Sequence, residues 1–225
     1  MNWTVSLFRS SLGAKYLMAL TGFIGYGFVI GHIAGNLLLF AGPDAMNSYG
    51  VSLREIPFGG LYIARAVLLL AVIVHIILAF RLKAQNRAAR PVKYAKDSTR
   101  VASLSSRTMA ITGSLILFYL VYHLAHFTWR VTAYDGPYVD YLGRDDVYTM
   151  VVTSFQQPLL SLIYIVGMLL VGFHLNHGAK SMFQTLGLNH PRYNPVIAVV
   201  PPAIGWFVAL AGVAIPVAVL VGIIK

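Results

Sequence analysis

The sequence lacks cysteine altogether and contains few charged residues, above all few acidic ones. Among its 225 residues there are 0 cysteines and 7 aspartates and glutamates, and charged residues of both signs make up 11% of the chain. The absence of cysteine excludes disulfides and thiolate-held iron–sulfur clusters. Hydrophobic residues make up 58% of the chain, and a soluble domain of this length needs far more charge to cover its surface. The composition therefore predicts an integral membrane protein.

The hydrophobic residues are collected in long runs, which divide the chain into candidate membrane spans. A helix crosses a bilayer with about 20 apolar residues. Stretches of this kind cover residues 15–40, 61–82, 108–130, 156–181 and 195–224. The first is too long for the apolar region of a signal peptide and has no obvious small-residue cleavage site, so we expect it to remain as a helix. The predicted fold class is an all-α integral membrane protein, a bundle of five transmembrane helices that forms a single domain over residues 1–225.

Basic residues are concentrated on one side of the predicted bundle. The net charge is +10, and most of the 17 lysines and arginines lie before the first span, around the connection between the second and third, or after the fourth. These residues are Arg9, Lys15, Arg81, Lys83, Arg87, Arg90, Lys93, Lys96, Arg100, Arg107, Lys180 and Arg192. The positive-inside rule places that side, and the N-terminus, in the cytoplasm. The acidic residues other than Asp97 lie in the opposite loops.

The basic side has two interpretations. It is an ordinary topology signal that also attracts anionic lipid headgroups, or it is a docking surface for a cytoplasmic partner. We expect no nucleic-acid binding, because the sequence contains no folded basic domain and no base-stacking surface.

Four of the spans contain a histidine, whereas none contains an aspartate or glutamate. The missing carboxylates argue against a proton pump with an acidic relay. With a rise of about 1.5 Å per residue, His32 lies about 25 Å and His123 about 24 Å from the cytoplasmic edge. His75 and His174 each lie about 9 Å from that edge. The depths therefore pair His32 with His123 near the outer face, and His75 with His174 near the inner face.

The paired depths point to iron. Ionisable side chains inside a membrane are costly, and each is by default a candidate functional group. Two imidazoles from different helices at one level can hold a haem iron between them, so the four histidines predict two haem groups. Such haem is noncovalent, since c-type attachment needs Cys-x-x-Cys-His. One alternative is interhelical hydrogen bonding by the histidines. Another is a zinc site built from the histidine pairs at i,i+3, His123 with His126 and His174 with His177, which the missing carboxylates disfavour and which would leave His32 and His75 unexplained.

Several neighbours of these histidines are candidates to contact a cofactor. His126 follows His123, and His177 follows His174, each by one helical turn on roughly the same face. Depth favours the first member of each pair as the ligand, and leaves the second to bind a haem propionate or a quinone carbonyl, or to lie at an interface. Lys180 is a candidate to pair with a propionate.

Small residues surround the histidine of the first span. Gly27, Gly31 and Gly35 recur every four residues around His32. Their missing side chains allow either a flat ring or a neighbouring helix to approach closely. His190 lies in a proline-rich loop and is expected to be solvated.

Motifs in a fixed order along almost the whole chain carry a family resemblance. They are Ser11-Leu-Gly-Ala-Lys15, Met18-Ala-Leu-Thr-Gly22, His32-Ile-Ala-Gly-Asn36-Leu, His75 followed by Asn86-Arg87-Ala-Ala-Arg90-Pro91, Ser106-Arg-Thr-Met109, His123-Leu124, His174-Leu-Asn-His177-Gly178 and Gln184-Thr-Leu-Gly187. With them the chain resembles the five-helix, two-haem cytochrome b subunit of bacterial succinate dehydrogenases (succinate:quinone oxidoreductases). The resemblance rests on the order and coverage of the motifs, because each block alone is short.

The resemblance implies a ligand set. His32 and His123 would hold the haem farther from the cytoplasm, and His75 and His174 the nearer one. The Leu-Asn-His177-Gly element leaves the choice between His174 and His177 open. The implied cofactors are two noncovalent b haems, with a quinone, menaquinone or ubiquinone, as the substrate.

The resemblance also implies a place in a complex. In that family a cytoplasmic flavoprotein oxidises succinate to fumarate, and an iron–sulfur protein passes the electrons to the membrane subunit, where quinone is reduced. The chain would be the membrane anchor of this tricarboxylic acid cycle and electron-transport enzyme in the bacterial cytoplasmic membrane. Succinate oxidation would take place in the partner subunits, and the complex can form a higher oligomer.

Residues that bind the quinone are less defined by the sequence. A quinone needs hydrogen-bonding groups at an apolar pocket near a haem, and each candidate is equally suited to anchor a helix at the membrane interface. The candidates are Arg9, Ser106, Arg107 and His177 on the inner side, and Arg54, Glu55 and Arg130 on the outer side. Two other functions remain open: a standalone quinol-linked cytochrome b served by another dehydrogenase, and a non-enzymatic haem or metal-ion transporter.

Overall fold

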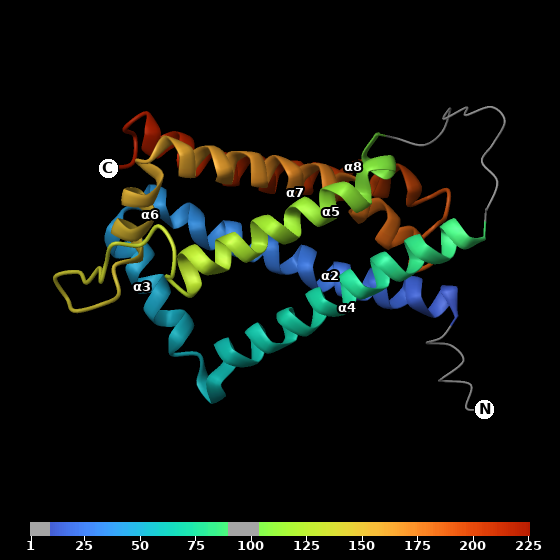
Figure 1. Ribbon diagram of the computed structural model, residues 1–225, viewed down its shortest axis with the longest axis horizontal. Helices are drawn as coiled ribbons and strands as arrows, with labels where there is room; N and C mark the ends of the chain where they lie inside the picture. The colour runs from blue at the N-terminus through green and yellow to red at the C-terminus, as the bar shows by residue number, and fades with distance from the viewer. Residues whose placement is uncertain (1–9, 90–103) are drawn as a thin grey trace.

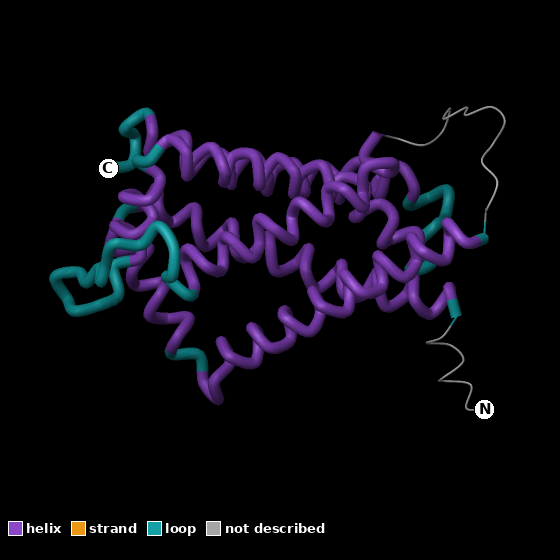
Figure 2. The backbone as a smooth tube through the Cα atoms, in the orientation of Figure 1, coloured by secondary structure: helices purple, strands orange, loops and turns teal. Residues whose placement is uncertain are grey.

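The computed structural model describes residues 10–89 and 104–225, with the backbone alone for 104–106. Within these ranges the regular structure is helical, and the one pairing outside the helices is an isolated bridge between Val139 and Asp145. The elements are α2 (Ser11–Asn36), η1 (Leu37–Ala41), α3 (Pro43–Arg54), η2 (Pro57–Gly59), α4 (Gly60–Ala88), α5 (Leu104–His123), η3 (Leu124–Thr128), α6 (Val147–Phe155), α7 (Pro158–Thr185) and α8 (Asn194–Leu220). Five long helices run along one common direction, as Figures 1 and 2 show.

The five predicted spans are confirmed as helices long and apolar enough to cross a membrane. In the described residues the spans are Ser11–Ala41, Pro57–Ala88, Arg107–Thr128, Pro158–Thr185 and Asn194–Leu220. Each boundary differs from its prediction by a few residues. The largest difference is at the second span, because α4 continues as a helix past the apolar stretch through Lys83 and Arg87. Long basic side chains allow this, since their stems cover apolar surface while their charges stay in water.

The two ends of the bundle carry opposite charge. The start of α2, the end of α4 and the connection from α7 to α8 lie at the same end of the bundle (Figure 1). The described basic residues of this basic end are Lys15, Arg81, Lys83, Arg87, Arg107, Lys180 and Arg192. Arg9, Arg90, Lys93, Lys96 and Arg100 of the predicted basic side, and Asp97, lie outside the described residues. The opposite end, the acidic end, carries α3, α6 and the loop 129–146 with its aspartates.

The most tightly packed part of the bundle is the contact between α7 and α8. Glycines allow this approach: a Cβ added at Gly172 would lie 2.8 Å from Ala209 Cβ, and one at Gly205 would lie 2.9 Å from Leu175 Cβ. Lipid cannot drive helices together by hydrophobicity, so close packing of small residues is what associates them. In the most apolar windows of α7 and α8, 39% and 44% of residues are buried, against 11% in α4 and 6% in the α5 span. Much of α4 and α5 is therefore left for something outside this chain to cover.

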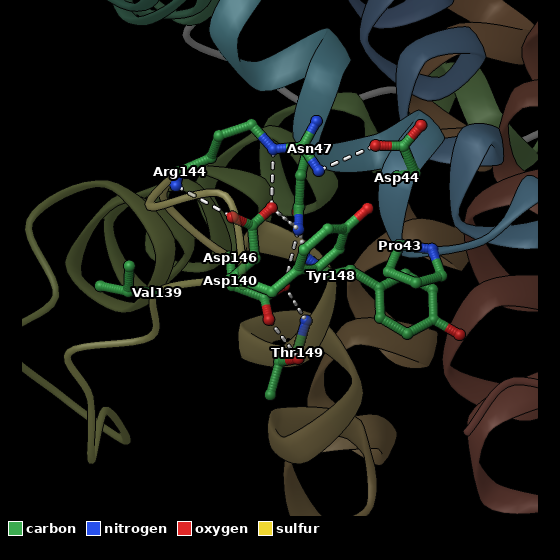
Figure 3. Close-up of a pocket in the computed structure, with 10 residues that line it drawn as sticks. Pro43, Asp44, Asn47, Val139, Asp140, Arg144, Asp146, Tyr148 and Thr149 are labelled. Atoms are coloured by element: carbon green, nitrogen blue, oxygen red, sulfur yellow. Dashed lines mark hydrogen bonds and ion pairs between the residues drawn. The ribbon is translucent and has the colours of Figure 1, made fainter.

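Two short helices at the acidic end, α3 and α6, were not among the predicted elements. Asn47 of α3 is 1% exposed. Its Nδ2 donates to Asp146 Oδ1 at 2.9 Å and Asp140 Oδ2 at 3.3 Å, and its Oδ1 accepts from the Tyr148 backbone N–H at 3.0 Å. These bonds join α3 to the loop and to α6 (Figure 3).

Arg144 completes this cluster. It donates to Asp140 at 2.7 Å, Ser48 at 2.7 Å and Asp44 at 2.8 Å. Around these groups lies a polar pocket of about 390 Å³, shown in Figure 3. Arg144 pairs with Asp44 and Asp140, and Asp146 accepts hydrogen bonds from Asn47 and Thr149, so we assign the cluster the role of closing the acidic end of the bundle.

Low pH should destabilise the acidic end of the bundle. Arg130 binds Asp145 at 2.5 and 3.0 Å, and Arg54 binds it at 2.5 Å. Burial alone raises the pKa of Asp145, but the hydrogen bonds from the two arginines outweigh it, so the pKa is lowered overall. The stabilisation is therefore present above the unfolded-state pKa of about 3.9 and is lost as the pH falls through the depressed value. We expect the melting temperature in detergent to drop steeply below about pH 4.

The matched variant is Asp145→Asn, which cannot titrate. It should be less stable than the wild type at pH 7, by about 1 kcal/mol, and less dependent on pH between 7 and 3. An Asp145→Asn variant with the pH profile of the wild type would exclude Asp145 as the source of the acid sensitivity.

Candidate functional site: two histidine pairs

The first histidine pair joins α2 to α5. The imidazole rings of His32 and His123 have their centroids 5.8 Å apart, with an angle of 88° between their planes. Phe28, one turn before His32, stacks on the His32 ring at 5.3 Å. His32 is exposed in the isolated chain, and a Cβ added at Gly31 would meet nothing within 4 Å. The pair therefore has open space beside it.

The second histidine pair joins α4 to α7. The rings of His75 and His174 have their centroids 6.5 Å apart, with an angle of 67° between their planes. Helix α4 packs chiefly along α2, and it diverges from α5 toward the acidic end (Figure 1). The two rings thus approach each other from helices that do not pack tightly together. The structure brings together the same two pairs that the depths of the residues predict.

The separation within each pair suits a metal ion held between two imidazoles. Metal–imidazole nitrogen bonds are about 2 Å long. Adding about 1.2 Å from each nitrogen to its ring centre gives a separation of about 6.4 Å between ring centroids. The observed values of 5.8 and 6.5 Å lie on either side of this distance. Within the described residues, no group of three or more potential metal-ligating side chains is found.

His123 and His126, which the sequence could not distinguish sharply, have different surroundings. The Nδ1 atom of His123 is buried, and it is the one buried side-chain nitrogen or oxygen in the described residues without a hydrogen-bond partner. His126 is 1% exposed and both its ring nitrogens are engaged, Nδ1 with the Tyr164 hydroxyl and Nε2 with the Ser154 hydroxyl, each at 3.0 Å. His126 therefore has no nitrogen free for iron or for a propionate.

A change of helix type separates the two residues. The chain passes from α5 into the π-helical turn η3 directly after His123. A π turn inserts an extra residue into the helical repeat and shifts the faces of the residues that follow. His126 consequently faces α6 and α7, whereas His123 faces α2.

Replacing His126 should affect stability and leave the histidine pairs intact. In His126→Leu the buried Tyr164 hydroxyl loses its partner, while Ser154 keeps its bond to the Met150 carbonyl at 2.7 Å. We expect a loss of about 1–3 kcal/mol of stability, seen as a lower melting temperature, with cofactor content per folded chain unchanged. The comparison is His123→Leu, which should lose cofactor. A His126→Leu protein that folds normally but lacks a cofactor would reverse the assignment of His123 and His126.

The other predicted cofactor contacts are placed as follows. His177 and Lys180 lie on α7 toward the basic end, one and two turns beyond His174, and both are partly exposed. The space at Gly35 is taken by α3, since an added Cβ would lie 2.5 Å from Tyr49 Cε1. Gly35 therefore serves helix packing, and Gly31 remains as a glycine beside open space. His190 is exposed in the loop before α8, as predicted.

The quinone candidates are widely separated. Arg9 and the side chain of Ser106 lie outside the described residues, and Arg107 is exposed at the basic end. At the acidic end Glu55 is exposed, while Arg54 and Arg130 both bind Asp145. The structure brings none of these residues together around the histidine pairs.

Two threonines that sequence reasoning missed lie against the inner pair. Thr21 Oγ1 lies 3.2 Å from His75 Nδ1, and Thr112 Oγ1 lies 3.4 Å from His174 Nδ1. A signal was present in the sequence, because Met18-Ala-Leu-Thr-Gly22 recurs as Met109-Ala-Ile-Thr-Gly113. The two copies are separated by the same number of residues as His32 and His123. The repeat places Thr21 of α2 and Thr112 of α5 at equivalent positions in their helices.

Comparisons of the chain with protein-family models, with curated proteins and with solved structures found no match.

Proposed function

We propose that the chain is the two-haem cytochrome b membrane anchor of a bacterial succinate dehydrogenase, which passes electrons from an iron–sulfur subunit to quinone. The observation that carries the proposal is the geometry of the four histidines. Two pairs from four helices lie at two levels of the bundle, with ring separations that suit one iron each. Each haem, when bound, supplies a one-electron carrier inside the membrane.

Other features of the bundle also support two haem sites. Each pair draws its ligands from two helices and so fixes the distance between them. Most of the α4 and α5 spans is not covered by the rest of the chain, and open space lies at Gly31 beside the outer pair. The described acidic residues all lie at the acidic end, so none of them faces the histidine pairs inside the spans.

The basic end is the proposed docking surface for the partner subunits. Its charge is not balanced by described acidic residues, all of which lie at the other end. By the positive-inside rule this end faces the cytoplasm. The inner pair, His75 and His174, is the pair closer to this end, so electrons would reach it first and then the pair His32 and His123.

The test is to express the chain with its partner subunits and to measure cofactor content and reduction. We expect two noncovalent, low-spin b haems per chain, both reducible by succinate in the complex. A folded but colourless protein would refute the proposal. Reduction by quinol without any association with succinate-oxidising subunits would identify a standalone cytochrome b. Haem that exchanges readily and is bound below one per chain would favour the transporter.

A further inference from the structure

We infer that Thr21 and Thr112 are positioning residues that set the tautomer and orientation of His75 and His174. Each hydroxyl accepts the Nδ1 proton of its histidine, so that both Nε2 lone pairs are presented to the space between the two rings. The inference rests on the proposed function, because it takes that space as the place of an iron.

The two contacts are equivalent in position. Thr21 of α2 meets His75 of α4 at 3.2 Å, and Thr112 of α5 meets His174 of α7 at 3.4 Å. Each threonine thus lies on the helix that packs against the helix of its histidine. Each threonine–histidine hydrogen bond lies within one pair of packed helices, α2–α4 or α5–α7. His75 and His174, in contrast, approach each other across the two helix pairs.

The direction of the hydrogen bonds follows from the number of protons. A threonine hydroxyl has one proton and two lone pairs. The Thr21 hydroxyl donates to backbone carbonyls of its own helix, at 2.9 Å to Leu17 and 3.1 Å to Met18. With the proton directed to these carbonyls the oxygen accepts, and we take the Nδ1 atom that faces it as the donor.

The second site repeats this arrangement. The Thr112 hydroxyl donates to the carbonyl of Thr108 at 3.1 Å or of Met109 at 3.2 Å, and its oxygen faces His174 Nδ1. A neutral imidazole with a proton on Nδ1 has its lone pair on Nε2. A second hydrogen bond of this kind is what fixes the tautomer and ring orientation of metal-binding histidines in general.

A glycine after each threonine brings the ring close to the helix. A Cβ added at Gly22 would lie 3.5 Å from His75 Cε1, and one at Gly113 would lie 3.3 Å from His174 Cε1. Each ring edge therefore rests on bare backbone next to the hydroxyl. The Thr-Gly pair is part of the repeated motif noted above, so the same local sequence produces the same contact twice.

The outer pair is built differently. His123 Nδ1 has no partner among the described residues, although His123 and His32 occupy equivalent places after the two copies of the motif. The threonine contacts therefore distinguish the inner pair from the outer one. A hydrogen-bonded Nδ1 proton makes an imidazole a stronger donor to a metal and favours the oxidised ion.

The experiment replaces each hydroxyl without changing the shape of the side chain. In Thr21→Val and Thr112→Val we expect the midpoint potential of one haem to rise while that of the other stays unchanged. We also expect affinity for that haem to fall about 10- to 100-fold. Thr21→Ser and Thr112→Ser, which restore the hydroxyl, should recover the potential. Ser114→Ala is the matched control, because Ser114 bonds its own helix carbonyl at Ala110 in the same way but contacts no histidine.

A second measurement does not depend on a bound cofactor. Ring nitrogen shifts of ¹⁵N-histidine in the apoprotein, in bilayers, should show His75 and His174 protonated on Nδ1, and the Val variants should lose this preference. Protonation of both residues on Nε2 in the wild-type apoprotein would overturn the inference. So would Val variants whose potential and affinity match those of Ser114→Ala. A colourless wild-type protein would refute the proposed function instead, and the nitrogen shifts would then decide the inference alone.

Discussion

Under the proposed function, replacing His174 by alanine is expected to reduce the haem content from two groups per chain to one. The rings of His174 and His75 approach each other at 6.5 Å from α7 and α4, and no third described side chain of a metal-binding type joins them. Loss of one imidazole removes half of the ligands that the protein offers to that iron. The same result is expected for His75→Ala, because the two residues serve one site.

The pairing gives this experiment an internal comparison. His32→Ala and His123→Ala should each remove the other haem, so the spectra of the four variants fall into two groups. His190→Ala, in an exposed loop, is the control and should keep both haems. Haem content is measured by pyridine haemochrome per mole of chain, with low-spin signals by electron paramagnetic resonance. Loss of both haems, or of neither, in His174→Ala would contradict the assignment of the pairs.

Gly205→Ala is expected to destabilise the protein, although alanine is the better helix former. The added Cβ would lie 2.9 Å from Leu175 Cβ and 3.6 Å from the Leu175 backbone carbon. Neither atom is at the end of a flexible side chain, so α7 and α8 must move apart. Overpacking of this kind costs about 1–3 kcal/mol, and the contact it disturbs is the closest helix pair of the bundle.

Gly25→Ala is the matched control on α2. A Cβ at Gly25 would meet nothing within 4 Å, so this change should be neutral or stabilising by up to about 1 kcal/mol. The melting temperatures of the two variants in detergent should move in opposite directions from that of the wild type. A Gly205→Ala protein as stable as Gly25→Ala would show that the two helices are not held by this contact.

The spans and the histidine pairs could be predicted from the sequence because both follow from the number of residues along a helix. A run of apolar residues fixes where a helix can cross a bilayer, and the rise per residue fixes the depth of each histidine. The helix α4 extends beyond its predicted end because hydrogen bonding along a helix does not stop where the apolar residues do. The haem, quinone and partner assignments stay predictions.

Other features depend on contacts between distant segments. Helices α3 and α6 are short and lack a long apolar run, and their place is set by the bonds of Asn47 and Arg144 to the loop between them. The role of His126 depends on the π turn and on Tyr164 and Ser154. Spacing alone put His126 on the face of His123, and it left Gly35 open to a flat ring or a neighbouring helix, which in the structure is α3 with Tyr49.

Under the proposed function, the distribution of the four histidines over the helices sets an order for haem insertion during synthesis. Neither the segment α2–α4 nor the segment α5–α7 contains both members of a pair, so neither could bind iron alone. The outer site is complete once the ribosome has made His123, whereas the inner site has to wait for His174. Cofactor insertion would then link the segment α2–α4, which is made early, to the segment α5–α7, which is made late. The outer site would be filled before the inner one.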